Sequence, residues 1–173
     1  MTTIEFHFDF GSPNAYLSHK LIPAIEQRTG TSFTYVPVLL GGVFKLTNNQ
    51  SPMMQFKDVK NKLEYQQLEM RRFIARHGLT MFQMNPHFPV NTVQIMRGAV
   101  VAEMDGVLLK YADAVFHHMW EEPKKMDDAE VIRAALGQSA IDAGRMLARI
   151  QDQDLKDALL KNTEASVSRG AFG

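Results

Sequence analysis

The chain opens with a strict alternation of apolar and polar side chains. From residue 4 to residue 10, isoleucine and phenylalanine alternate with glutamate, histidine and aspartate. Because successive side chains of a strand point to opposite faces, this period of two predicts a strand with one buried face. Residues 33–40 are rich in β-branched and aromatic side chains and predict a second strand.

The segment between these two strands carries the signals of a helix. Ser12 is a good N-cap, and Pro13 suits the first helical position, where its lack of an N–H group costs nothing. Apolar residues then recur at helical spacing, and Gly30 is typical of a helix C-terminus. The opening therefore predicts a β-α-β unit, and its two strands should lie parallel in one sheet.

The rest of the chain predicts a loop followed by helices. Residues 41–52 begin with two glycines and end in a polar run, which we interpret as one long loop. Helical periodicity follows over 55–77, and an extended connector over 79–89. Five further helices are predicted at 92–103, 107–122, 128–136, 141–150 and 154–168. No strand pattern lies among them, so the sequence predicts an α/β fold with an all-helical insertion.

Composition and charge exclude several classes of function. The 173 residues favour one domain, or one domain with a sizeable insertion. Nineteen basic residues balance nineteen acidic ones, so no nucleic-acid partner is expected. No apolar run approaches the roughly 18 residues of a membrane span, and no secretory signal is recognisable, so we predict a cytoplasmic protein without a membrane partner. The absence of cysteine excludes disulfides, thiolate metal sites and dithiol redox chemistry.

Ser12 is the first candidate functional residue. The predicted strand ends and the helix begins at this point, where backbone N–H groups and the helix dipole favour an anion. Open α/β sheets also bind ligands at this end of their strands. The hydroxyl could donate to a thiolate, phosphate or carboxylate, or Ser12 could be an N-cap alone. No base adjoins Ser12 in the sequence, so an acyl-transfer triad has little support.

Lys45 and Asn49 are the second candidates, because their loop should emerge at the same end of the sheet. They could hold a carboxylate or a peptide-like ligand, or belong to a solvated loop. The histidines show no H-x-H, H-x-x-x-H or H-E-x-x-H spacing, so no metal is predicted. No glycine-rich nucleotide motif is present either.

Four segments together resemble a known family: FDFGSPNAYL at 8–17, LGGVFK with NQSP within 40–52, PHFPVNT at 86–92 and RGAFG at 169–173. They are similar to 2-hydroxychromene-2-carboxylate isomerases and kappa-class glutathione transferases. Both belong to the thioredoxin-like superfamily and carry a helical insertion, as in DsbA-type oxidoreductases. In the redox relatives a C-P-x-C motif stands where this chain has Ser12-Pro13-Asn14-Ala15. Serine there marks the glutathione-using branch.

The resemblance implies a division of the chain into three parts. Residues 1–49 would begin a thioredoxin-like domain, 50–168 would form the helical insertion, and 169–173 would return to the first domain. In the family, the G-x-F-G segment continues into a Val-Pro pair, two strands and a final helix. The resemblance therefore implies that such C-terminal strands follow Gly173, where the present sequence ends.

The resemblance also implies a ligand and a reaction. Glutathione would be the cofactor, held at Ser12, Lys45, Asn49, Phe172 and Gly173. A small aromatic carboxylate substrate would contact Lys45, Asn49 and Asn91, in a homodimer. The implied reaction interconverts 2-hydroxychromene-2-carboxylate and trans-o-hydroxybenzylidenepyruvate, with Ser12 stabilising the glutathione thiolate. The alternatives are a kappa-like transferase that conjugates electrophiles and a non-enzymatic thioredoxin-like binding module.

Overall fold

A parallel pair of strands forms the sheet of this protein. The computed structural model describes residues 3–173. Strand β1 (Ile4–Phe8) pairs in parallel with β2 (Phe33–Pro37), and α1 (Pro13–Thr29) connects them, which confirms the predicted β-α-β unit. Both strands are shorter than predicted. Strand β2 ends at Pro37, and the N–H of Val38 makes one further hydrogen bond, to the carbonyl oxygen of Phe8 at 3.0 Å.

Helices make up most of the remaining chain. They are α2 (Leu40–Leu46), α3 (Pro52–Gln55), α4 (Lys62–His77), α5 (Val93–Met104), α6 (Leu108–Trp120), α7 (Ala129–Gln138), α8 (Ala143–Arg149) and α9 (Gln153–Ser168). The described residues between 50 and 168 contain no strand, as the sequence predicts. The all-helical character predicted for this segment is therefore confirmed, while the exact domain boundaries stay a prediction.

Two predictions about the middle of the chain are wrong. The segment 41–52, expected as one loop, contains most of α2 and begins α3. The helix expected over 55–77 is divided, because α3 ends at Gln55 and α4 begins only after Asn61. Asn61 adopts a left-handed conformation with φ of 65°, which a continuous right-handed helix does not allow.

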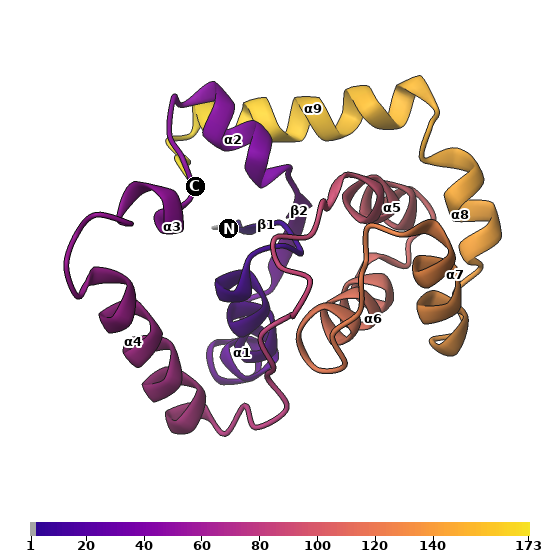
Figure 1. Ribbon diagram of the computed structural model, residues 1–173. Coiled ribbons are helices and arrows are strands. Elements are labelled where there is room, and N and C mark those ends of the chain that lie inside the picture. The colour runs from indigo at the N-terminus through magenta and orange to yellow at the C-terminus, as the bar shows by residue number, and fades with distance from the viewer. Residues whose placement is uncertain (1–2) are drawn as a thin grey trace.

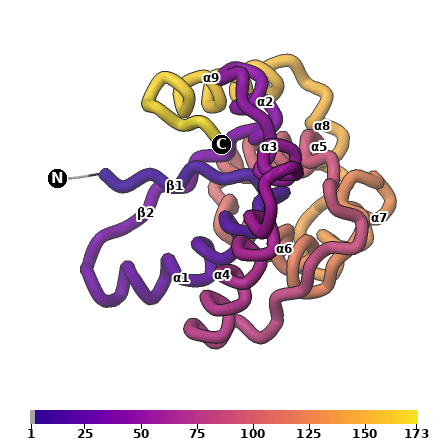
Figure 2. Tube along the Cα trace, turned by 60° about the vertical axis from the view of Figure 1, so that its left-hand side comes forward, coloured from indigo at the N-terminus to yellow at the C-terminus, as the bar shows by residue number. Residues whose placement is uncertain are grey.

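The sheet lies between two layers of helices (Figure 1). Helices α1 and α6 cover one face, where the rings of Phe8 and Phe116 lie 6.0 Å apart. Helices α2 and α9 run side by side over the other face, and the hydroxyl of Thr163 in α9 accepts the backbone N–H of Leu39 at 3.0 Å. In Figure 2 the C-terminus lies close to α2.

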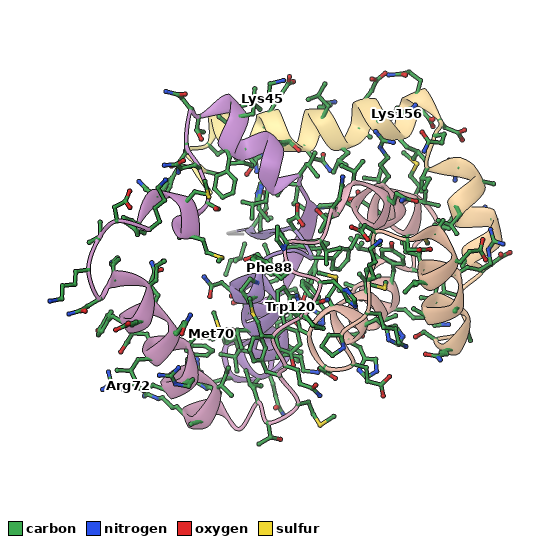
Figure 3. All side chains as sticks on the ribbon, viewed as in Figure 1. Lys45, Met70, Arg72, Phe88, Trp120 and Lys156 are labelled. Carbon is green, nitrogen blue, oxygen red and sulfur yellow. The ribbon has the colours of Figure 1, made fainter. Side chains whose placement is uncertain are left out.

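Helix α4 stands at the margin of the molecule and has no fully buried residue. Met70 points from it toward the body of the protein and packs against the core, while Arg72 points away (Figure 3). Among residues 3–173, no helix has both the length and the apolar character needed to cross a membrane.

One apolar core joins the sheet to the helical part. The ring of Phe10 packs 4.8 Å from Phe116 and 5.8 Å from Tyr111, both in α6. The fully buried Trp120, also in α6, donates its indole N–H to the carbonyl oxygen of Phe10 at 2.9 Å. Each such buried aromatic side chain stabilises the fold by about 1.5–3 kcal/mol. The turn between β1 and α1 is therefore held directly by α6.

Candidate functional site

A cavity of about 330 Å³ opens beside β1, between the start of α1 and the C-terminal segment. Its apolar wall comes from Phe6, Phe8, Ala15, Val38, Leu40, Val43, Ala171 and Phe172. Its polar groups come from His7, Asp9, Ser12, Asn14, Ser18 and Ser166, and Gly173 completes the rim. Small-molecule sites have this character, with mainly apolar walls and a few polar groups in volumes of about 300–1,000 Å³.

Ser12 lines this cavity and caps α1, as the sequence predicts. Its Oγ accepts the backbone N–H of Ala15 at 3.2 Å, and its own N–H donates to the carbonyl oxygen of Asp9 at 3.0 Å. Because Oγ acts as the acceptor in the cap, the hydroxyl proton remains available for an anion in the cavity. The dipole of the 17-residue α1 favours negative charge at the same place.

Asp9 is a buried acid that sequence reasoning missed. One carboxylate oxygen accepts the N–H of Gly11 at 2.8 Å, and the other accepts the N–H of Leu40 at 2.8 Å and the hydroxyl of Thr92 at 3.1 Å. Burial raises the pKa of Asp9, and these three hydrogen bonds oppose that shift. Asp9 thus ties together the β1–α1 turn, the start of α2 and the start of α5.

His7 is a second polar residue of the cavity that was not predicted. Its Nε2 lies 2.8 Å from a carboxylate oxygen of Glu5, which also pairs with Arg169. Its Nδ1 is buried and has no hydrogen-bond partner among the described residues. Burial lowers the pKa of His7. The strict alternation of β1 could have indicated this placement, because Glu5, His7 and Asp9 share one face of the strand.

The C-terminal segment is the part of the predicted glutathione site that the structure brings to Ser12. Phe172 and Gly173 line the same cavity as Ser12. Asn49 does not line the cavity, but its side-chain amide donates to the carbonyl oxygen of Phe172 at 2.8 Å. Asn49 therefore positions one wall of the cavity.

The other two predicted residues lie outside the cavity lining. Lys45 is exposed on α2 (Figure 3). Asn91 is also exposed, and its side-chain oxygen accepts the N–H of Val93 at 3.1 Å at the start of α5. Ligand contacts by Lys45 and Asn91 stay predictions.

The fold and the cavity define a class of protein: a thioredoxin-like chain without cysteine, with a serine at the N-terminus of its first helix. A family model, the DSBA-like thioredoxin domain, matches residues 3–173. The chain belongs to this family.

Curated relatives connect the chain to two kinds of enzyme. It is 26% identical over 121 residues to a 2-hydroxychromene-2-carboxylate isomerase of Pseudomonas putida, a match that covers 69% of this chain and 56% of that protein. It is 24% identical over 175 residues to glutathione S-transferase kappa 1 of Rattus norvegicus, covering 98% and 77%. These matches confirm the family resemblance described for the sequence.

A solved structure of 2-hydroxychromene-2-carboxylate isomerase shares the fold. The two chains superpose with a TM-score of 0.79 over 99% of this chain and 82% of the other, at 22% identity. Identity at this level establishes the common fold and no more.

Proposed function

We propose that this protein is a glutathione-dependent isomerase that interconverts 2-hydroxychromene-2-carboxylate and trans-o-hydroxybenzylidenepyruvate in the cytoplasm. The observation that carries the proposal is the placement of Ser12. Its hydroxyl lines a largely apolar cavity at the N-terminus of a long helix, in a chain that has no thiol of its own. The relationship to both kinds of enzyme supports it.

The residues present fit a bound thiol. When bound, glutathione supplies a soft nucleophile whose reversible addition to the side-chain double bond permits rotation. Ser12 would donate its hydroxyl proton to the thiolate, and the dipole of α1 would favour the same charge. Phe6, Leu40 and Phe172 offer apolar surface for an aromatic ring. Lys45, Asn49 and Asn91 remain the candidates for carboxylate groups.

The ionisation of bound glutathione tests the role of Ser12. A hydrogen bond to a charged group is worth about 1.5–3 kcal/mol, so Ser12→Ala should raise the pKa of the bound thiol by about 1–2 units. The measurement is a pH titration of the thiolate absorbance in complexes of glutathione with wild type and with the variant. Identical titrations of the two complexes would show that Ser12 only caps α1, and would contradict the proposed mechanism.

A kappa-like transferase is the second candidate function. It is supported by the match to the rat kappa-class enzyme, which covers 98% of this chain at 24% identity. The two reactions differ in their thiol balance. An isomerase leaves the concentration of free glutathione unchanged, whereas conjugation consumes one thiol for each adduct formed. Thiol counting during turnover of the chromene carboxylate and of a simple electrophile separates them.

We further propose a homodimer, by analogy with the family. Light scattering at micromolar protein concentration tests it, and a mass equal to that of one chain would contradict it.

A further inference from the structure

A cluster of metal-ligating side chains lies at the C-terminal end of α6, outside the lining of the cavity. His117, His118 and Glu122 each place one ligating atom within 4.8 Å of the others. The sequence spacing does not predict this arrangement, because adjacent residues of a helix diverge around its axis. The helix ends at Trp120, however, and the N–H of Glu122 turns back to the carbonyl oxygen of His117 at 2.9 Å.

His118 directs the unprotonated nitrogen of its ring toward this cluster. The ring is buried, and its Nε2 lies 3.1 Å from the carbonyl oxygen of Ala135 in α7. A carbonyl oxygen only accepts, so Nε2 carries the proton and Nδ1 is the unprotonated nitrogen. The neutral ring is the form that binds metals.

His117 is oriented in a similar way. Its Nδ1 lies 2.9 Å from a carboxylate oxygen of Glu121, so Nδ1 donates and Nε2 is free. This Nε2 lies 3.6 Å from the carboxylate of Glu122. Metal-binding histidines usually donate their second ring nitrogen to a carboxylate or a backbone carbonyl, which fixes the tautomer and the ring orientation. Both histidines of the cluster have such a partner.

A positive charge already lies against His118 and Glu122 in this cluster. The ammonium group of Lys124 is 3.0 Å from Nδ1 of His118 and 3.8 Å from the carboxylate of Glu122. It also donates to the side-chain oxygen of Gln138 at 2.9 Å. The cluster is therefore arranged to hold a cation, and a lysine side chain has a flexible stem on which its ammonium group can swing into solvent.

We infer that His117, His118 and Glu122 form a binding site for a divalent metal of the zinc type, which takes the place of the Lys124 ammonium. Imidazole nitrogen and carboxylate oxygen are ligands that Zn²⁺ accepts, at distances of about 2.1 Å. A tetrahedral ion with such bonds holds its ligand atoms roughly 3.4 Å apart. Side-chain rotations that move each ligand atom by about an ångström therefore bring the three atoms to bonding distance from one ion. Three protein ligands leave one position for water.

Titration calorimetry with Zn²⁺ tests this site, using the full chain without a histidine tag and after treatment with a chelator. We expect one equivalent to bind. Glu122→Gln and His118→Gln should each weaken binding at least tenfold, whereas His87→Gln, at an exposed histidine outside the cluster, should leave it unchanged. Lys124→Met removes the competing ammonium and should strengthen binding about tenfold.

The spectrum of Co²⁺ added in place of Zn²⁺ gives a second measurement, because tetrahedral nitrogen and oxygen coordination produces intense visible absorption. Absence of binding, or binding that Glu122→Gln leaves unchanged, overturns the inference. An unchanged affinity in Lys124→Met overturns the proposed exchange with the ammonium group. If His118→Gln fails to fold, Glu122→Gln still tests the site. The side chain of Glu122 is 59% exposed, so replacing Glu122 should not disturb the core.

Discussion

The carboxylate of Asp9, one residue beyond β1, accepts the backbone N–H of Leu40, the first residue of α2, at 2.8 Å. The first N–H groups of a helix have no partner within it, and here a side chain 31 positions earlier supplies one. A single buried carboxylate therefore sets the position of α2 relative to β1, and with it one wall of the cavity.

Asp9→Asn should lower the free energy of unfolding by about 1–3 kcal/mol. An asparagine has one accepting oxygen, so its NH₂ group would face at least one of the donors Gly11, Leu40 and Thr92. Urea unfolding measures the loss, and amide exchange should accelerate at the start of α2. Asp58→Asn, at an exposed position, is the matched control and should have almost no effect. Equal stability of wild type and Asp9→Asn would show that these hydrogen bonds contribute nothing net.

Ser12→Ala should also cost about 1 kcal/mol of stability, because α1 loses its N-cap. Asp128→Ala provides a matched comparison, since Asp128 caps α7 by accepting the N–H groups of Glu130 and Val131. The two variants should lose similar stability in thermal unfolding. The pKa of bound glutathione should change in Ser12→Ala alone, and an equal change in Asp128→Ala would assign the effect to general destabilisation.

His7 predicts a pH dependence of stability. Burial lowers its pKa in the folded protein, so the unfolded chain binds more protons as the pH falls below about 6.5. The contribution of His7 to stability is complete above that pH and is lost as the pH falls through the folded-state pKa. Between pH 7.5 and pH 5, urea unfolding should therefore show a larger loss for wild type than for His7→Gln. Parallel losses in the two proteins would contradict this prediction.

Gly98 in α5 should tolerate no larger side chain. A Cβ atom there would overlap the phenol group of Tyr111 and lie 3.0 Å from the sulfur of Met146. Overpacking of this kind costs about 1–3 kcal/mol, so Gly98→Ala should lower the melting temperature. Gly137→Ala in α7 is the control: nothing lies within 4 Å of its added Cβ, and alanine is the better helix former. An unchanged melting temperature in Gly98→Ala would contradict the close approach of α5 and α6.

Local signals were sufficient to predict the opening β-α-β unit. The alternation in β1, Ser12 with Pro13 at the start of α1 and Gly30 at its end all act within a few residues. Helix α2 was not predicted, because Gly41 and Gly42 are poor helix formers. The contact that stabilises its start comes from Asp9, which is distant in sequence.

The candidate site was predictable where it depends on a helix start, and unpredictable where it depends on tertiary contacts. Ser12 could be found because a strand end followed by an N-cap is visible in the sequence. Phe172 was expected at the site only through the family resemblance, because its placement against the cavity depends on α9 and on the hydrogen bond from Asn49. The turn after Trp120 that brings Glu122 to His117 has no signal in the spacing of the histidines.

Trp120 is the single tryptophan of the chain, and its indole N–H is bonded to the carbonyl of Phe10, two residues before Ser12. Phe82 and Phe88 lie about its ring, at centroid distances of 6.0 Å and 6.1 Å. The protein thus carries its one tryptophan fluorophore at the contact between the β1–α1 turn and the helical part. Its emission wavelength reports whether water reaches that contact, so separation of the two parts can be followed without a label, even where the helices themselves stay folded.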